Sequence, residues 1–247
     1  SDISRYANSQ NAVRQSDLSA NKPFHVDVER LSLSVYCPDG TGRWFYERAA
    51  GSYNTLLARE GVTPAKLRAL KESMPAGRRI TKTELAKYFM AWDGQPDVVS
   101  LGSQKCFDRF MSGMADSEAG SGAPAPDVAY FKSIAAKALL FKTVHKAARP
   151  LVPAFLANVA AYTVAVISKT YGEPFDLDRI WSRQAISPQL VEQANIWARE
   201  VYDRLLETAN GKMISEWAKR PECLEAMFSR PFSSPVIDVP EARRGGQ

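Results

Sequence analysis

The segment VAYFKSIAAKALLFKTVHKAA, residues 128–148, decides the fold. Its apolar side chains recur every three or four residues and therefore share one stripe of an α-helix. The residues on this stripe are Phe131, Ile134, Ala138, Phe141 and Val144. A helix of this kind buries its stripe against other helices, while Lys137 and Lys142 fall on its polar side and need no further role. The segment predicts a helical bundle.

The segments that follow predict more helices of the same bundle. Residues 153–171 are apolar almost all round, which is typical of a central helix. Ser187-Pro188 combines a capping hydroxyl with a proline in the first turn, and Asn210-Gly211 is a helix stop. Asn158, inside the apolar helix, needs a hydrogen-bond partner. We expect it to join two helices or to bond the Trp217 indole.

The chain before the bundle predicts a mixture of helix and strand. A helix capped by Ser19 is expected to carry apolar residues from Phe24 to Val35. After turn residues, the aromatic and alternating segment Arg43–Arg48 favours a strand over a helix start. Thr63-Pro64 and Thr81–Glu84 are helix starts, the first through a cap and a proline.

Two composition breaks divide the chain. Residues 117–126, SEAGSGAPAP, predict a flexible linker or long loop, because small residues and prolines bury too little surface to become ordered. Residues 230–247 predict a disordered tail for the same reason. The expected fold is mainly α, with α+β character in the N-terminal part. A small mixed part at residues 1–116 packs on a helical bundle at residues 127–229.

The composition restricts the function classes. The 45% hydrophobic content of 247 residues is ordinary for a soluble globular protein, and no run approaches a membrane span. The three cysteines, Cys37, Cys106 and Cys223, are far apart, and two histidines leave little material for a metal site. A net charge of +5 is compatible with a phosphate-rich partner without requiring one. These counts predict a cytoplasmic protein with no disulfide framework and no zinc ribbon.

Seven short pieces of the chain occur in a characteristic order. They are Asn8–Asn11; Tyr46–Arg48 with Gly51 and Tyr53; Thr81–Lys87; Tyr130–Lys132 running into Lys137–Lys142; Ala157–Thr163; Ile180-Trp181 with Gln184; and Ser215–Lys219 with Cys223. Together they resemble one protein family, the abortive phage infection (AIPR) family. The similarity extends from Tyr6 to about Leu224, which is most of the chain. Seven pieces in order are more specific than any one of them.

The resemblance implies a prokaryotic or phage-borne cytoplasmic protein that serves antiviral defence. Because family members extend further at the N-terminus, the chain is expected to be the C-terminal half of such a protein. The candidate partners are therefore nucleic acid and an N-terminal portion of the same protein, with no membrane. The resemblance supplies no catalytic residues and does not specify an oligomeric state.

The run Asn8-Ser9-Gln10-Asn11 is the first candidate contact for nucleic acid. Amides donate and accept hydrogen bonds at once, as reading base edges requires. The alternative is that Asn8, Gln10 and Asn11 form hydrogen bonds with backbone groups of their own loop, as Asn and Ser commonly do.

Basic residues near the predicted strand are the second candidate. Glu47 and Arg48 point to opposite faces of a strand, so Arg48 is available either for phosphate or for a structural salt bridge. Arg79 and Lys82 belong to the densest basic cluster, with Lys66, Arg68 and Lys71 nearby. This cluster reads either as a patch that follows phosphates or as an ordinary solvated surface.

Three functions remain open at this stage. The preferred one is a nucleic-acid-binding or regulatory module of an abortive-infection protein, without catalysis in this chain alone and without a cofactor. The second is a metal-dependent nuclease in which Asp39 and Glu47 hold Mg²⁺. The third is a protein-interaction module that senses a phage component.

Overall fold

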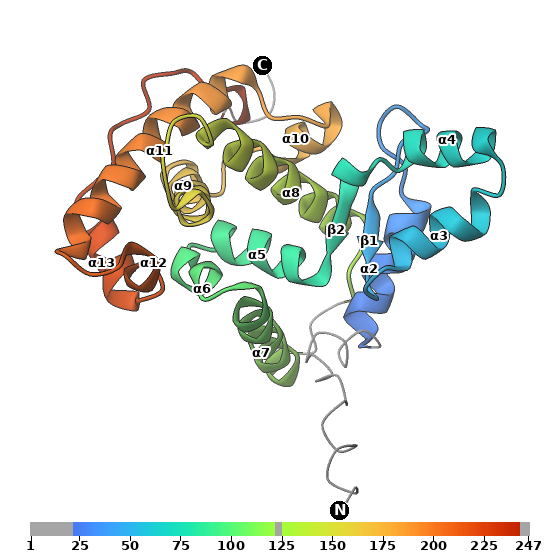
Figure 1. Ribbon diagram of the computed structural model, residues 1–247, viewed down its shortest axis with the longest axis horizontal. Helices are drawn as coiled ribbons and strands as arrows, with labels where there is room; N and C mark the ends of the chain where they lie inside the picture. Colours follow the sequence, from blue (N-terminus) through green and yellow to red (C-terminus); the bar gives the residue numbers. More distant parts are fainter. Residues whose placement is uncertain (1–21, 122–124, 243–247) are drawn as a thin grey trace, which may run out of the picture.

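The computed structural model describes residues 22–121 and 125–242, with side chains described outside 116–121. The chain is mainly α, and its two strands belong to the N-terminal part (Figure 1). In that part lie α2 (Pro23–Ser34), β1 (Phe45–Glu47), α3 (Ser52–Glu60), α4 (Pro64–Ser73), η2 (Ala76–Arg78) and β2 (Arg79–Thr81). The bundle consists of α5 (Lys82–Trp92), α6 (Pro96–Ser100), α7 (Ser103–Ser121), α8 (Val128–Ala148), α9 (Leu156–Tyr171), α10 (Leu177–Arg183), α11 (Pro188–Ala209), α12 (Ile214–Trp217), α13 (Pro221–Phe228) and η3 (Pro240–Ala242).

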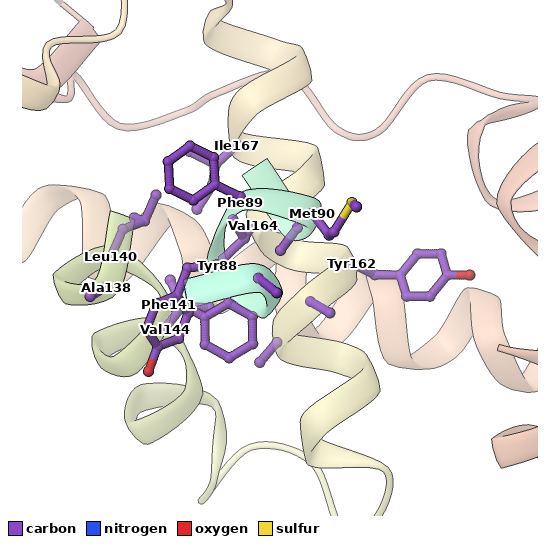
Figure 2. Packing of buried hydrophobic residues seen from close by; sticks show 14 of the residues in the cluster. Tyr88, Phe89, Met90, Ala138, Leu140, Phe141, Val144, Tyr162, Val164 and Ile167 are labelled. Atoms are coloured by element: carbon purple, nitrogen blue, oxygen red, sulfur yellow. The ribbon is translucent and has the colours of Figure 1, made fainter. Parts of the chain in front are cut away.

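The large core lies among α5, α8, α9 and α11. Figure 2 shows side chains from three of these helices converging, with Phe89 on α5, Leu140 on α8 and Val164 on α9. The helix α9 is buried on nearly all sides along Val159–Ile167, as its apolar composition predicts. Trp197 is fully buried, and Trp181 and Trp217 are nearly so. The predicted helical bundle is confirmed.

The same core extends well before residue 127. Every helix from α5 to α13 contributes buried residues to it, so α5, α6 and α7 belong to the bundle. The linker expected at residues 117–126 begins too early, because α7 continues to Ser121. Phe107 and Phe110 anchor that helix in the core. Burial at its start thus outweighs the small residues near its end.

The tail expected to be disordered is packed over residues 230–242 instead. It crosses α11 as a strap, seen in dark red along the top of Figure 1. Arg204, only 4% exposed, donates to the carbonyls of Met227, Arg230 and Pro231. The composition argument failed because a long helix, not the strap itself, supplies the hydrogen-bond partners.

Further along the strap, α11 supplies more polar anchors. The Trp197 Nε1 donates to the Ser233 carbonyl at 2.9 Å. The Gln193 Oε1 accepts from the backbone of Val236 and Ile237. The strap ends at Glu241, which is 1% exposed and caps the start of α11 through Ser187.

The two strands form a small parallel sheet between two cores. Phe45 pairs with Arg79, and Tyr46 with Ile80. Alternation along β1 sends Tyr46 into the large core and Phe45 into a second, small core. The strand predicted over Arg43–Arg48 is therefore confirmed at its centre.

Several helix starts follow their sequence signals. Thr63 accepts from the Lys66 N–H, and Thr81 forms a full capping box with Glu84. Asp176 and Ser187 cap α10 and α11 in the same way. The first helix of the described residues begins at Pro23 rather than after Ser19, which lies outside those residues.

Asn158 joins two helices, one of the two roles expected for it. Its Nδ2 donates to the Ser100 Oγ at 2.9 Å, which links α9 to the end of α6. The alternative bond to the Trp217 indole is not made, because that Nε1 donates to the Thr208 Oγ1. Asn158 is half-buried, so one protein partner and solvent satisfy its amide.

Candidate nucleic-acid interface

The candidate surface lies on an arm, defined here as residues 43–82, from the segment containing β1 through α3 and α4 to β2. Figure 1 shows α3 and α4 on the side of the sheet away from the bundle. Only Phe45, Tyr53 and Met74 are buried in the small core of the arm. The Tyr53 hydroxyl donates to the Met74 carbonyl at 2.7 Å and joins α3 to the end of α4. A Cβ at Gly61 would lie 2.5 Å from the Leu57 carbonyl oxygen, so the turn between the helices requires glycine.

The arm carries the positive charge of the whole protein. It contains three acidic residues, Glu47, Glu60 and Glu72, against nine basic ones. The basic residues are Arg43, Arg48, Arg59, Lys66, Arg68, Lys71, Arg78, Arg79 and Lys82. The rest of the chain holds 23 Lys and Arg against 24 Asp and Glu, so it is close to neutral.

The outer surface of α4 presents the cations with the fewest partners. Lys66, Arg68 and Lys71 are exposed, and none of them forms an ion pair within the described residues. Arg68 and Lys71 are three residues apart and share a helix face, while Leu67 and Leu70 pack toward α3 or the small core. The helix therefore presents exposed side-chain cations with no ion-pair partner among the described residues.

The arginine predicted beside the strand forms a salt bridge. Arg48 pairs through Nε with Glu29 on α2, and about a quarter of each side chain is exposed. Glu47 is buried, and its Oε1 accepts from the Gly51 N–H at 3.2 Å. β1 ends at Glu47, so Arg48 follows the strand, and its pairing with Glu29 is the structural salt bridge that was one of its two expected roles.

The remaining predicted cations lie at the base of the arm. Arg79 pairs with Glu47 at 3.7 Å and lies over the Tyr53 ring, with 39% of its side chain exposed. Lys82 is only 5% exposed, so it is not part of a surface that follows phosphates. Lys82 is the first residue of α5, and its charge contributes to the lowered pKa of His25. Asn8, Gln10 and Asn11 lie outside the described residues.

The two carboxylates of the nuclease alternative each have an arginine. Asp39 lies in a turn, where it accepts from the backbone N–H groups of Thr41 and Gly42, and these bonds lower its pKa. Its Oδ2 is 4.0 Å from Arg78, whereas Glu47 pairs with Arg79. Among the described residues, no three or more His, Cys, Asp or Glu side chains gather closely enough to hold a metal ion. This arrangement does not resemble a metal site.

Two residues predicted to have no role in fact attach α8 to its surroundings. The Lys142 Nζ donates to the carbonyls of Gly77 and Arg79 at 2.9 and 2.8 Å and holds the base of the arm. Lys137 lies with its Nζ 3.9 Å from the Phe89 ring centroid. Burial lowers the pKa of both lysines. The polar face of α8 is covered because the arm and α5 pack across it.

A second attachment joins the arm to α10. Gln184 has a left-handed backbone, and its Oε1 accepts from the Trp44 indole at 2.9 Å. Its Nε2 donates to the Trp181 carbonyl. No local pattern connects Trp44 with Gln184, whereas the excess of cations over residues 43–82 could have been counted from the sequence.

The fold and surface together define a mainly α protein with a basic arm. Within the described residues, no helix combines the length and apolarity needed to cross a membrane. A family model described as AIPR protein matches residues 1–209. The chain therefore belongs to the AIPR family, and membership indicates a role in abortive phage infection. No curated protein and no solved structure matches the chain.

Proposed function

We propose that this chain is a nucleic-acid-binding module of an abortive-infection protein, and that its arm binds the phosphate backbone. One observation carries the proposal: an excess of six positive charges is concentrated in 40 residues, while the rest of the chain is nearly neutral. Concentrated surface cations attract a polyanion through counterion release, independently of base sequence. The proposal requires no cofactor.

The contacts are assigned by exposure and pairing. Lys66, Arg68 and Lys71 are the principal phosphate contacts, because they are exposed and have no ion pair among the described residues. Arg79 remains a secondary contact at the base of the arm. Arg48, held by Glu29, positions the strand instead. Asn8, Gln10 and Asn11 remain predicted contacts that would read bases or clamp a loop.

The salt dependence of binding follows from this assignment. Three phosphate contacts predict that log K falls with log[salt] with a slope of about −2.7 for duplex DNA and about −2.1 for single strands. The test is fluorescence anisotropy with labelled duplex DNA, single-stranded DNA and RNA across a salt series, with and without Mg²⁺. Binding that weakens with these slopes and leaves the probe intact is the expected result.

A pair of matched variants locates the binding surface. In the arm variant, Lys66, Arg68 and Lys71 are each replaced by Glu, and affinity at low salt is expected to fall at least about 100-fold. The control replaces Lys146, Arg183 and Arg199 by Glu, which changes the net charge equally at exposed positions of the bundle. Equal losses in both variants would contradict an arm-specific site.

Two other results would favour one of the alternative functions. Probe shortening that needs Mg²⁺ and disappears in Glu47→Ala would support the nuclease alternative. No binding to any probe at low salt would reject the proposal and leave the protein-interaction module.

A further inference from the structure

A cavity of about 410 Å³ lies in the bundle, away from the outer surface of the arm. Its lining residues come from α5, α6, α7, α8, α9 and the segment around α12. Its apolar lining residues, here called the apolar wall, include Val99, Phe141 and Ala157. Figure 2 shows Phe141 on α8 facing the α5 side of the core. The polar part of the lining consists of charged, hydroxyl and amide side chains.

Three basic side chains from separate elements line this cavity. They are Lys87 on α5, His145 on α8 and Lys219 after α12. Lys219 pairs with Glu216 at the exposed rim, at 2.6 Å. Burial, followed by the charges of Lys87 and Arg149, lowers the pKa of His145. The imidazole is therefore a neutral donor or acceptor at neutral pH.

Lys87 is a half-buried ammonium group in the lining of the cavity. Within the described residues it forms no ion pair and no hydrogen bond, and it lies 5.1 Å from the Phe141 ring centroid. Burial lowers the pKa of Lys87, and the Glu84 carboxylate opposes that shift. The Glu84 carboxylate also lines the cavity, and its Oε2 accepts from the Thr81 N–H in the capping box.

Uncharged polar groups complete the lining. Ser103 contributes a hydroxyl at the start of α7, and Asn158 and Ser100 are bonded to each other at 2.9 Å. That bond fixes the Asn158 amide, whose Nδ2 is its donor. The cavity therefore combines the Lys87 and Lys219 ammonium groups, the Glu84 carboxylate, neutral donors and an apolar wall, and a few polar groups beside apolar ones are usual in a small-molecule site.

We propose that this cavity binds a phosphate monoester of mononucleotide size. Lys87 neutralises the phosphate, Ser103 and His145 donate hydrogen bonds to its oxygens, and the apolar wall receives the remainder of the ligand. A free nucleotide and the 5′-phosphorylated end of a nucleic acid present the same group. The inference does not depend on phosphate-backbone binding by the arm, because none of the exposed arm cations lines the cavity.

The test is isothermal titration calorimetry of the intact chain with AMP, adenosine and inorganic phosphate. AMP is expected to bind at least about tenfold more tightly than either of the other two. Only AMP combines a phosphate for the basic side chains with a nucleoside for the apolar wall. A 5′-phosphorylated dinucleotide and its 5′-hydroxyl form, compared in the same way, show whether a nucleic-acid end can enter. Failure of AMP to bind at millimolar concentration, or equal affinity for adenosine, would overturn the proposal.

The variant Lys87→Met keeps the apolar stem and removes the charge. AMP affinity is expected to fall at least about tenfold, while the Tm of the free protein holds or rises because a desolvated ammonium is lost. Lys146→Met on the exposed face of α8 is the matched control and should leave AMP binding unchanged. Unaltered AMP affinity in folded Lys87→Met would place the ligand elsewhere. Oligonucleotide binding by the arm should survive in Lys87→Met, so each proposal can fail without the other.

Discussion

The arm and the bundle differ in how many residues they bury and in their net charge. The bundle buries residues from every helix between α5 and α13, and the chain outside the arm has almost no net charge. The arm buries only Phe45, Tyr53 and Met74 in its small core, and its surface carries the cations. Few helix faces in the arm are needed for packing, so more of them are available for charge. The arm therefore depends on the bundle for its position, through the Lys142 and Gln184 attachments.

The largest expected effect tests how closely the large core of the bundle is packed. Leu140 on α8 is fully buried in the large core. Leu140→Ala therefore leaves a cavity and lowers the free energy of unfolding by about 4 kcal/mol. Urea denaturation followed by circular dichroism measures this loss. Val128→Ala, at a 46% exposed position of the same helix, is the control and should cost well under about 1 kcal/mol. A loss below about 1 kcal/mol would contradict the close packing of Leu140 in the large core.

The next effect concerns the joint between arm and bundle. The fully buried His25 Nδ1 is 2.7 Å from the Tyr46 hydroxyl, and its ring is stacked between Tyr46 and Phe107. Burial, and then the charge of Lys82, lowers the pKa of His25 from 6.5 to about 4. Below pH 6.5 the unfolded chain therefore binds a proton at His25, whereas the folded chain binds it only near pH 4. The free energy of unfolding should therefore fall by about 3 kcal/mol as the pH is lowered from 6.5 to 4.

Urea titrations at a series of pH values measure this change. The same titrations on His25→Gln, which keeps a polar partner for Tyr46, should show a flatter profile from pH 6.5 to 4. Carboxylates elsewhere contribute to both proteins, so the difference between them isolates the histidine. Identical profiles would show that His25 is protonated equally in both states.

The smallest effect is confined to the arm. Met74 is 1% exposed in the small core, and Met74→Ala is expected to cost about 2 kcal/mol there. Amide hydrogen exchange should accelerate in α3 and α4 while exchange in α8 and α9 is unchanged. Val62→Ala, at a 66% exposed position of the arm, is the control. Acceleration throughout the bundle would contradict a separable small core.

Much of the fold was predictable because its signals are local. A capping hydroxyl needs only the next three residues, so Thr63, Thr81 and Ser187 identified their helices correctly. The stripe on α8 predicted a bundle for the same reason. The strap over residues 230–242 was missed because its partners, Arg204 and Glu200 among them, are on a helix earlier in the chain.

The candidate site likewise has features that local sequence determines and features that only tertiary packing determines. Sequence alone determined the helical class, the strand at Phe45–Glu47 and the excess of cations in the arm, because periodicity, capping and charge depend on neighbouring residues. Only the tertiary structure decided which cations remain available. Packing buried Lys82, paired Arg48 with Glu29 and left Lys66, Arg68 and Lys71 exposed. It also brought Lys87, His145 and Lys219 to one cavity, because burial and pairing arise only when distant segments meet.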